Sequence, residues 1–135
     1  MQTIIRTIAI ALLASPIALV AQSGNVNLPQ DKGPKQIDVS SYPAPMQKAY
    51  KTFETKCSKC HTIARPINTT MTKDEWERYV KRMMHKPNSG ISNSQGKEIF
   101  DFLAYDQATR KDKNPSKFYK SLSDEEIEKL RAQQQ

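Results

Sequence analysis

The sequence has little apolar material and no pattern that favours a sheet. Aromatic residues make up 7% of the 135 residues, and the mean hydropathy is −0.71. No segment alternates between apolar and polar residues with a period of two, and no internal repeat is present. These absences argue against a β-sandwich, a barrel or a repeat protein. A chain of this length is expected to form one domain with a modest core.

Cysteine and histidine are also scarce. Cys57 and Cys60 are the only cysteines, and His61 and His85 the only histidines. A structural zinc site would need two ligands besides the cysteine pair, and only His85 lies outside the cysteine segment, so zinc is not expected. A thioredoxin-type CxxC site needs a preceding strand and a βαβ unit, which the sequence does not predict. One disulfide is possible in an exported chain, but the histidine directly after Cys60 indicates other chemistry.

Only one long apolar run is present, and it lies near the N-terminus. Arg6 is followed by the mostly apolar residues 7–21, and the run ends in small residues. This pattern is typical of a secretory signal peptide, which we assign to residues 1–23. The run is short for a bilayer span, and no cysteine near its end suggests a lipoprotein. We therefore expect a periplasmic protein; the alternative is an uncleaved N-terminal anchor.

The remaining chain divides into three parts by composition. Residues 24–44 are rich in proline and lack helical periodicity, so we expect an extended arm. Residues 45–110 contain the strongest helical patterns and are expected to form the folded domain. Residues 111–135 are expected to be a tail with a short helix. Because helical patterns are the only regular ones, the predicted class is all-α.

Four helices are expected, three in the domain and one in the tail. The first begins near Pro45 and runs to about Cys60, with apolar residues at helical spacing. The other three begin with capping boxes, in which a Ser or Thr is followed three residues later by Glu or Gln. These boxes are Thr72 with Glu75, Ser92 with Gln95, and Ser123 with Glu126. The last helix has few apolar residues, so we expect it to dock loosely.

The motif with the clearest chemistry is Cys57-Ser58-Lys59-Cys60-His61, a CxxCH site. This pattern is typical of covalent attachment of one c-type haem. Two thiols three positions apart can form thioethers with the two vinyl groups of one porphyrin. His61 then lies beneath the ring, where its imidazole can ligate the iron. The expected cofactor is one covalently bound haem c, which would also help to fill the small core.

Residues 42–106 resemble the class I c-type cytochromes. The resemblance rests on CxxCH near the end of the first helix and on Ile99-Phe100-Asp101-Phe102-Leu103 in the last core helix. The spacing of Trp76, Val80 and Met83 is similar to short members of that family, including the haem domain of the reaction-centre cytochrome of green sulfur bacteria. The resemblance implies a class I fold with three core helices around one haem. It also implies that the carbonyl of Pro66 accepts a hydrogen bond from His61.

A class I site needs a second axial ligand to the iron, and helical geometry ranks the candidates. At about 100° per residue, Met83 lies about 20° around the helix from Trp76, near the centre of the apolar stripe. Met84 lies at its edge and His85 on the opposite face. Met83 is therefore the expected ligand, with Met84 and His85 as alternatives. An open iron site is a further possibility, and Met46 and Met71 are less well placed.

The expected function is transfer of single electrons between redox partners, without catalysis. The formal net charge is +7, and residues 46–86 contain ten basic and four acidic residues. This charge around the cysteines favours docking to redox proteins with acidic surfaces, and nucleic acid is not an expected partner. Two alternatives stay open. One is a haem protein or enzyme with an open iron, and the other is a cytochrome subunit of a membrane complex, associated through an uncleaved N-terminus or through its partner.

Overall fold

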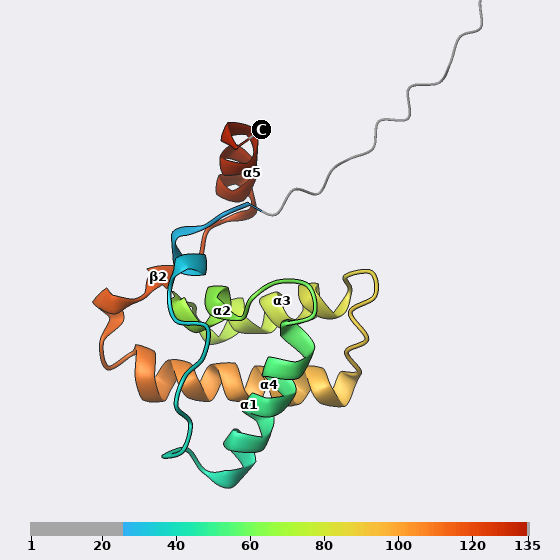
Figure 1. The fold of residues 1–135 in the computed structure, drawn as a ribbon, viewed down its shortest axis with the longest axis vertical. Coiled ribbons are helices and arrows are strands. Elements are labelled where there is room, and N and C mark those ends of the chain that lie inside the picture. The colour runs from blue at the N-terminus through green and yellow to red at the C-terminus, as the bar shows by residue number, and fades with distance from the viewer. Residues whose placement is uncertain (1–25, 135) are drawn as a thin grey trace, which may run out of the picture.

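Helices predominate in the computed structural model, which describes residues 26–134 (Figure 1). The predicted signal peptide and the first residues of the arm lie outside this range. The mostly helical content agrees with the predicted all-α class. The helices are α1 (Ala44–Cys57), α2 (Ala64–Asn68), α3 (Lys73–Met84), α4 (Asn93–Asp106) and α5 (Asp124–Gln133). A π-helical turn, η2 (Gln107–Lys111), continues α4, and η1 (Pro29–Lys32) and η3 (Pro115–Lys117) are 3₁₀ turns.

All three predicted capping boxes form. Thr72, Ser92 and Ser123 each accept a hydrogen bond from the backbone N–H three residues later, and the Glu or Gln at that position bonds back. These reciprocal bonds satisfy backbone donors that a helix start would otherwise leave without partners. The starts of α3, α4 and α5 are therefore fixed by local sequence.

The first helix ends earlier than the sequence analysis predicted. The backbone N–H of Ser58 bonds the carbonyl of Glu54 at 3.1 Å and closes the last turn of α1, which ends at Cys57 instead of about Cys60. Residues 58–60 form a turn. Cys57 therefore belongs to the helix, whereas Cys60 and His61 follow it.

The core lies where α4 packs between α1 and α3. The rings of Phe53 and Phe102 are fully buried, with centroids 5.3 Å apart, and Tyr50 lies 5.2 Å from Phe102. Trp76 of α3 is also fully buried. Aromatic side chains from all three helices thus supply most of the bulk that the apolar-poor sequence can bury.

The two strands were not predicted. β1 (Thr69–Thr70) and β2 (Tyr119–Lys120) pair in parallel, with Thr69 opposite Tyr119 and Thr70 opposite Lys120. Two residues are too few to produce a period-two pattern in the sequence. The pair joins the tail to the segment that directly follows α2.

The arm is packed against the domain. Val26, Leu28 and Gln30 are buried. The side-chain amide of Asn68 donates to the carbonyls of Gln30 and Pro34, each at 3.0 Å. The arm thus lies along α2 and is hydrogen-bonded to it. Part of the arm forms the turn η1.

The last helix is set apart from the others (Figure 1). None of the residues of α5 is buried, which agrees with the expected loose docking. It is connected to the domain by an ion pair between Arg82 and Asp124 at 3.0 Å. Among residues 26–134, no helix has the length and apolar content to span a membrane.

Candidate functional site

The two cysteines lie at the end of α1 and in the turn that follows it. Cys57 is half-buried and packs against the edge of the core, whereas Cys60 is exposed. Both are free thiols. The structure therefore presents two unpaired sulfur atoms at the carboxyl end of one helix, one facing the core and the other facing solvent.

The environment of Cys57 does not suit thiol catalysis. Burial, with a smaller contribution from the neighbouring Cys60, raises the pKa of this thiol to about 12. A reactive thiolate needs the opposite effect, because the cysteines of disulfide oxidoreductases have lowered pKa values. The surroundings of Cys57 are instead those of a sulfur in an apolar setting, which suits a thioether.

His61 is held in a form that can ligate a metal. Its Nδ1 lies 2.9 Å from the carbonyl oxygen of Thr62. Because a carbonyl only accepts hydrogen bonds, Nδ1 carries a proton, and in the neutral imidazole the lone pair is then on Nε2. A hydrogen bond from the second ring nitrogen to a carbonyl is the usual way in which proteins orient a metal-ligating histidine.

The expected hydrogen bond from His61 to Pro66 is not formed. The carbonyl of Pro66 accepts instead from Nζ of Lys111 at 2.7 Å, and Thr62 takes the role that the resemblance gave to Pro66. The physical reason is that Pro66 lies inside α2, where its carbonyl is turned toward η2. This part of the sequence analysis was wrong.

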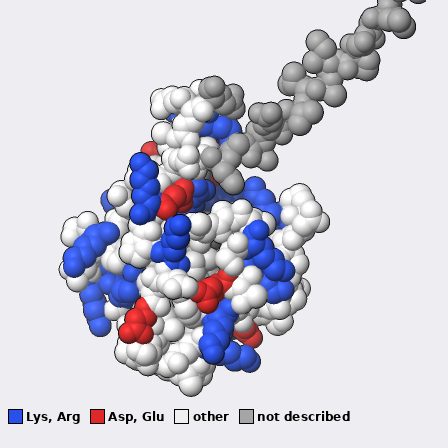
Figure 2. Space-filling model, in the orientation of Figure 1, with Lys and Arg blue, Asp and Glu red and all other residues white. Residues whose placement is uncertain are grey.

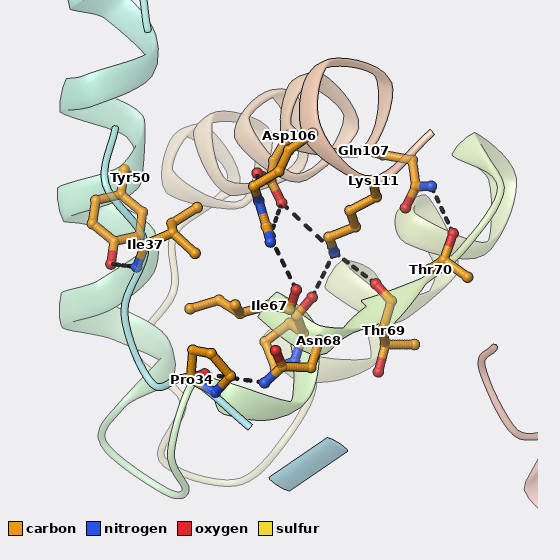
Figure 3. Close-up of polar contacts among 12 residues, drawn as sticks. Pro34, Ile37, Tyr50, Ile67, Asn68, Thr69, Thr70, Asp106, Gln107 and Lys111 are labelled. Carbon is orange, nitrogen blue, oxygen red and sulfur yellow. Dashed lines mark hydrogen bonds and ion pairs between the residues drawn. The ribbon is translucent and has the colours of Figure 1, made fainter. Parts of the chain in front are cut away.

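Side chains satisfy most of the carbonyls of the short helix α2, and Figure 3 shows the donors that come from η2. Five residues allow few internal hydrogen bonds, so the last carbonyls of such a helix need other donors. Here four successive carbonyls have one. Asn68 donates to Ala64, Thr69 to Arg65, Lys111 to Pro66 and Arg110 to Ile67, at 2.7, 2.8, 2.7 and 3.0 Å. Arg110 and Lys111 thereby fix the segment after CxxCH to η2.

The candidate methionines of α3 differ in their contacts. Met83 and Met84 are both partly buried against the core. The sulfur of Met84 lies over Gly96 of α4, so close that a Cβ at Gly96 would meet it at 2.3 Å. Met84 thus fills the space between α3 and α4, which is a packing role.

The other candidates have different surroundings. His85 is exposed, and its Nδ1 lies 2.6 Å from the carbonyl of Lys81 on its own helix. Met46 and Met71 are partly buried at the edge of the core. His85 therefore lies on the exposed side of the helix end, in agreement with the wheel geometry.

The donor set fits a covalently attached haem. Two free thiols, three positions apart, are followed by an imidazole whose Nε2 is available. Within residues 26–134, no group of three or more His, Cys, Asp or Glu side chains could hold a metal ion directly.

The basic side chains of residues 59–86 differ in whether they are paired with an acidic side chain. Arg65 forms two hydrogen bonds with Asp31, and Lys81 pairs with Glu77 at 2.6 Å. Lys59 and Lys86 are exposed and form no ion pair within the described residues. On the face drawn in Figure 2, Lys and Arg cover more of the surface than Asp and Glu. Uncompensated charge thus lies on Lys59 in the cysteine turn and on Lys86 after the end of α3.

A buried charged cluster near α2 was missed by the sequence analysis. Asp106 is 1% exposed and Lys111 is fully buried. Asp106 binds Arg110 through both carboxylate oxygens at 2.7 Å and accepts from the hydroxyl of Tyr42 at 2.8 Å. In an α-helix, residues 106 and 111 would point about 140° apart. The π turn, closed by a bond from Asp112 to Gln107, brings them to one side, and no sequence signal marked that turn.

Comparisons with protein-family models, curated proteins and solved structures found no match for this chain.

Proposed function

We propose that this protein is an exported, single-haem c-type cytochrome of the class I type, which carries one electron at a time and catalyses no reaction of its own. The observation that carries the proposal is the combination at the end of α1. Two free thiols and an imidazole with a free Nε2 lie in the order and spacing that haem attachment requires.

The chain's own residues have distinct roles in this proposal. Cys57 and Cys60 would hold the porphyrin through thioethers to its two vinyl groups. His61 would ligate the iron through Nε2, and its hydrogen bond to Thr62 would orient the ring. A bound haem c supplies an iron that alternates between the ferric and ferrous states.

Met83 is the proposed second axial ligand. It is partly buried on the core-facing side of α3, and the competing side chains have other contacts. Met84 packs on Gly96, and the ring of His85 is exposed and bonded to a carbonyl of its own helix. A thioether ligand stabilises ferrous iron and raises the reduction potential.

The packing of the helices supports the class I proposal. That family places an aromatic-bearing first helix against the last core helix beside the haem. Here α1 packs on α4 through Phe53 and Phe102, and three core helices precede the short α5.

Redox proteins with acidic surfaces are the proposed partners. Lys59 and Lys86 flank the cysteine turn and the end of α3, where the electron would enter and leave, and neither pairs with a described carboxylate. Exposed uncompensated charges act mainly on the rate of encounter.

Covalent haem attachment is the test of this proposal. The full chain is expressed with an export signal in cells that attach c-type haem, and the denatured protein is separated and stained for haem. We expect haem to stay with the wild-type chain and to be lost from the Cys57→Ser, Cys60→Ser double variant. Ser58→Ala is the matched control, because this exposed residue lies between the cysteines and should attach haem normally. Haem-free wild-type chain from competent cells would disprove the proposal.

The spectrum of the loaded protein then separates the alternatives. A low-spin spectrum without rapid carbon monoxide binding supports an electron carrier. A high-spin spectrum with rapid binding would instead support a ligand-binding protein or enzyme. Sequencing of the N-terminus of the exported chain distinguishes a free periplasmic protein from an anchored subunit.

A further inference from the structure

A fully buried lysine connects the two segments that carry the proposed iron ligands. Nζ of Lys111 donates to the carbonyls of Pro66 and Thr69, at 2.7 and 2.6 Å, in the segment that follows His61 (Figure 3). The same nitrogen lies 4.5 Å from the centre of the Trp76 ring. Trp76 belongs to α3, two turns before Met83. One side chain thus contacts both the segment that follows His61 and the helix that carries Met83.

Lys111 has no buried carboxylate of its own among the described residues. Asp106 of α4 lies 3.7 Å from Nζ, but it already binds Arg110 of η2 through both oxygens. Asp112, just after η2, contributes a further negative charge nearby. The arm adds only the hydroxyl of Tyr42, α2 and β1 add carbonyls, and α3 adds the Trp76 ring. Two cations therefore share one buried carboxylate.

Burial is the main reason why the proton of Lys111 is easy to remove. Against the attraction of Asp106, burial and the nearby charge of Arg110 together lower the pKa of its ammonium to about 7. A neutral amine can still donate two hydrogen bonds, so Pro66 and Thr69 keep their donor when the proton leaves. The site can change its charge without losing its contacts.

We propose that Lys111 is a positioning residue of the haem site and also a proton site coupled to electron transfer. This inference rests on the proposed function. Lys111 takes a proton from water as one electron enters the protein, and it releases the proton when the electron leaves. If one proton enters with each electron, the net charge of the buried region stays the same.

Two measurements on the haem-loaded full chain test the coupling. The first follows the Lys111 ε-carbon by carbon-13 NMR through a pH titration, with the signal assigned by its absence from Lys111→Met. We expect its midpoint at a higher pH in the ferrous than in the ferric protein, because the added electron attracts the proton. The second is the reduction potential, which we expect to fall between pH 6 and pH 8 in wild type and to stay level in Lys111→Met.

Two further variants keep the test decisive if Lys111→Met does not fold. Asp112 is exposed, and Asp112→Asn keeps the oxygen that accepts from Gln107 while removing a charge near Lys111. We expect it to shift both the NMR midpoint and the fall in potential to lower pH. Lys113→Met removes a charge from an exposed neighbour and should leave both midpoints unchanged.

Equal NMR midpoints in the two redox states, or an unchanged pH profile in Asp112→Asn, would overturn the coupling and leave the proposed cytochrome function intact. A wild-type chain without covalent haem would refute both.

Discussion

At the scale of single residues, the side chain of Met83 would set the reduction potential of the proposed cytochrome. Ferric haem ligated by a methionine sulfur has a weak far-red absorption band. We expect this band in wild type and its loss in Met83→Leu, which keeps the apolar bulk and removes the sulfur. Met84→Leu should keep the band, because that side chain packs on Gly96. Absorption spectra of the three ferric proteins measure the effect.

The opposite pattern, with the band lost only in Met84→Leu, would assign the ligand to Met84. A wild-type low-spin spectrum without the band would point to His85.

Residue roles that depend on distant contacts could not be predicted. The CxxCH motif carries its chemistry within five consecutive residues, so Cys57, Cys60 and His61 stand out in the sequence. Lys111 has no such signal, since a lysine among charged residues is usually exposed. Its burial depends on carbonyls that lie more than 40 residues away.

At the scale of elements, the capping boxes allow a comparison between a core helix and a loosely docked one. Thr72→Ala removes the cap of α3, which buries Trp76, Tyr79 and Val80. We expect it to lower the free energy of global unfolding by about 1 kcal/mol. Ser123→Ala removes the same cap from α5, which buries nothing, and should leave global unfolding unchanged.

Urea denaturation of both variants measures the difference. Hydrogen exchange should show faster opening of α5 in Ser123→Ala. Equal losses of global stability would mean that α5 unfolds together with the core.

One buried side-chain amide, that of Asn68, joins the arm to α2. Asn68 donates to the carbonyls of Gln30, Pro34 and Ala64, so Asn68→Ala leaves buried acceptors without a donor. We expect a loss of about 1–3 kcal/mol in the free energy of unfolding and faster hydrogen exchange in residues 28–34. The exposed Asn93→Ala is the control. Unchanged exchange in the arm would show that other contacts, such as that between Arg65 and Asp31, suffice to hold it.

The difference between local and distant contacts explains which elements could be predicted. The starts of α3, α4 and α5 follow from residues three positions apart, so the sequence predicts them. α2 is five residues long and its carbonyls are satisfied largely by side chains of other elements. No local pattern therefore marks α2, η2 or the β1–β2 pair.

At the scale of the whole molecule, Lys111 makes stability depend on pH. Its pKa is about 7 in the folded protein, against an ordinary value of 10.5. Between these values the unfolded chain binds more protons, so the free energy of unfolding rises with pH. The rise is at most about 1.4 kcal/mol per pH unit.

Urea denaturation of wild type and Lys111→Met between pH 7 and pH 9 tests this sign. Higher pH is avoided, because burial also raises the pKa of Tyr42 and Tyr79, and their effect runs the other way. The rise should be absent from Lys111→Met. A wild-type stability that falls over this interval would contradict it.

The uneven charge of the molecule should control its encounters with partners. We expect the rate of electron transfer to an acidic redox protein to fall as ionic strength increases, because salt screens exposed charges. Lys59→Glu should slow the reaction at low salt. Lys113→Glu, a residue beyond the other end of α4 from the cysteine turn, should have a smaller effect. Stopped-flow kinetics measure both, and a flat salt profile would remove the docking proposal.

The two ends of the described chain meet. The side-chain amide of Gln134 bonds both the N–H and the carbonyl of Asn27, at 2.9 and 3.1 Å. The polypeptide between them is therefore almost a closed ring, and a short glycine-rich linker can join residues 27 and 134. New ends can then be opened in the exposed turn at residues 86–88, between the helix of the proposed sulfur ligand and α4. Such a permuted chain offers an attachment point for an electrode or a second redox protein beside the proposed haem site.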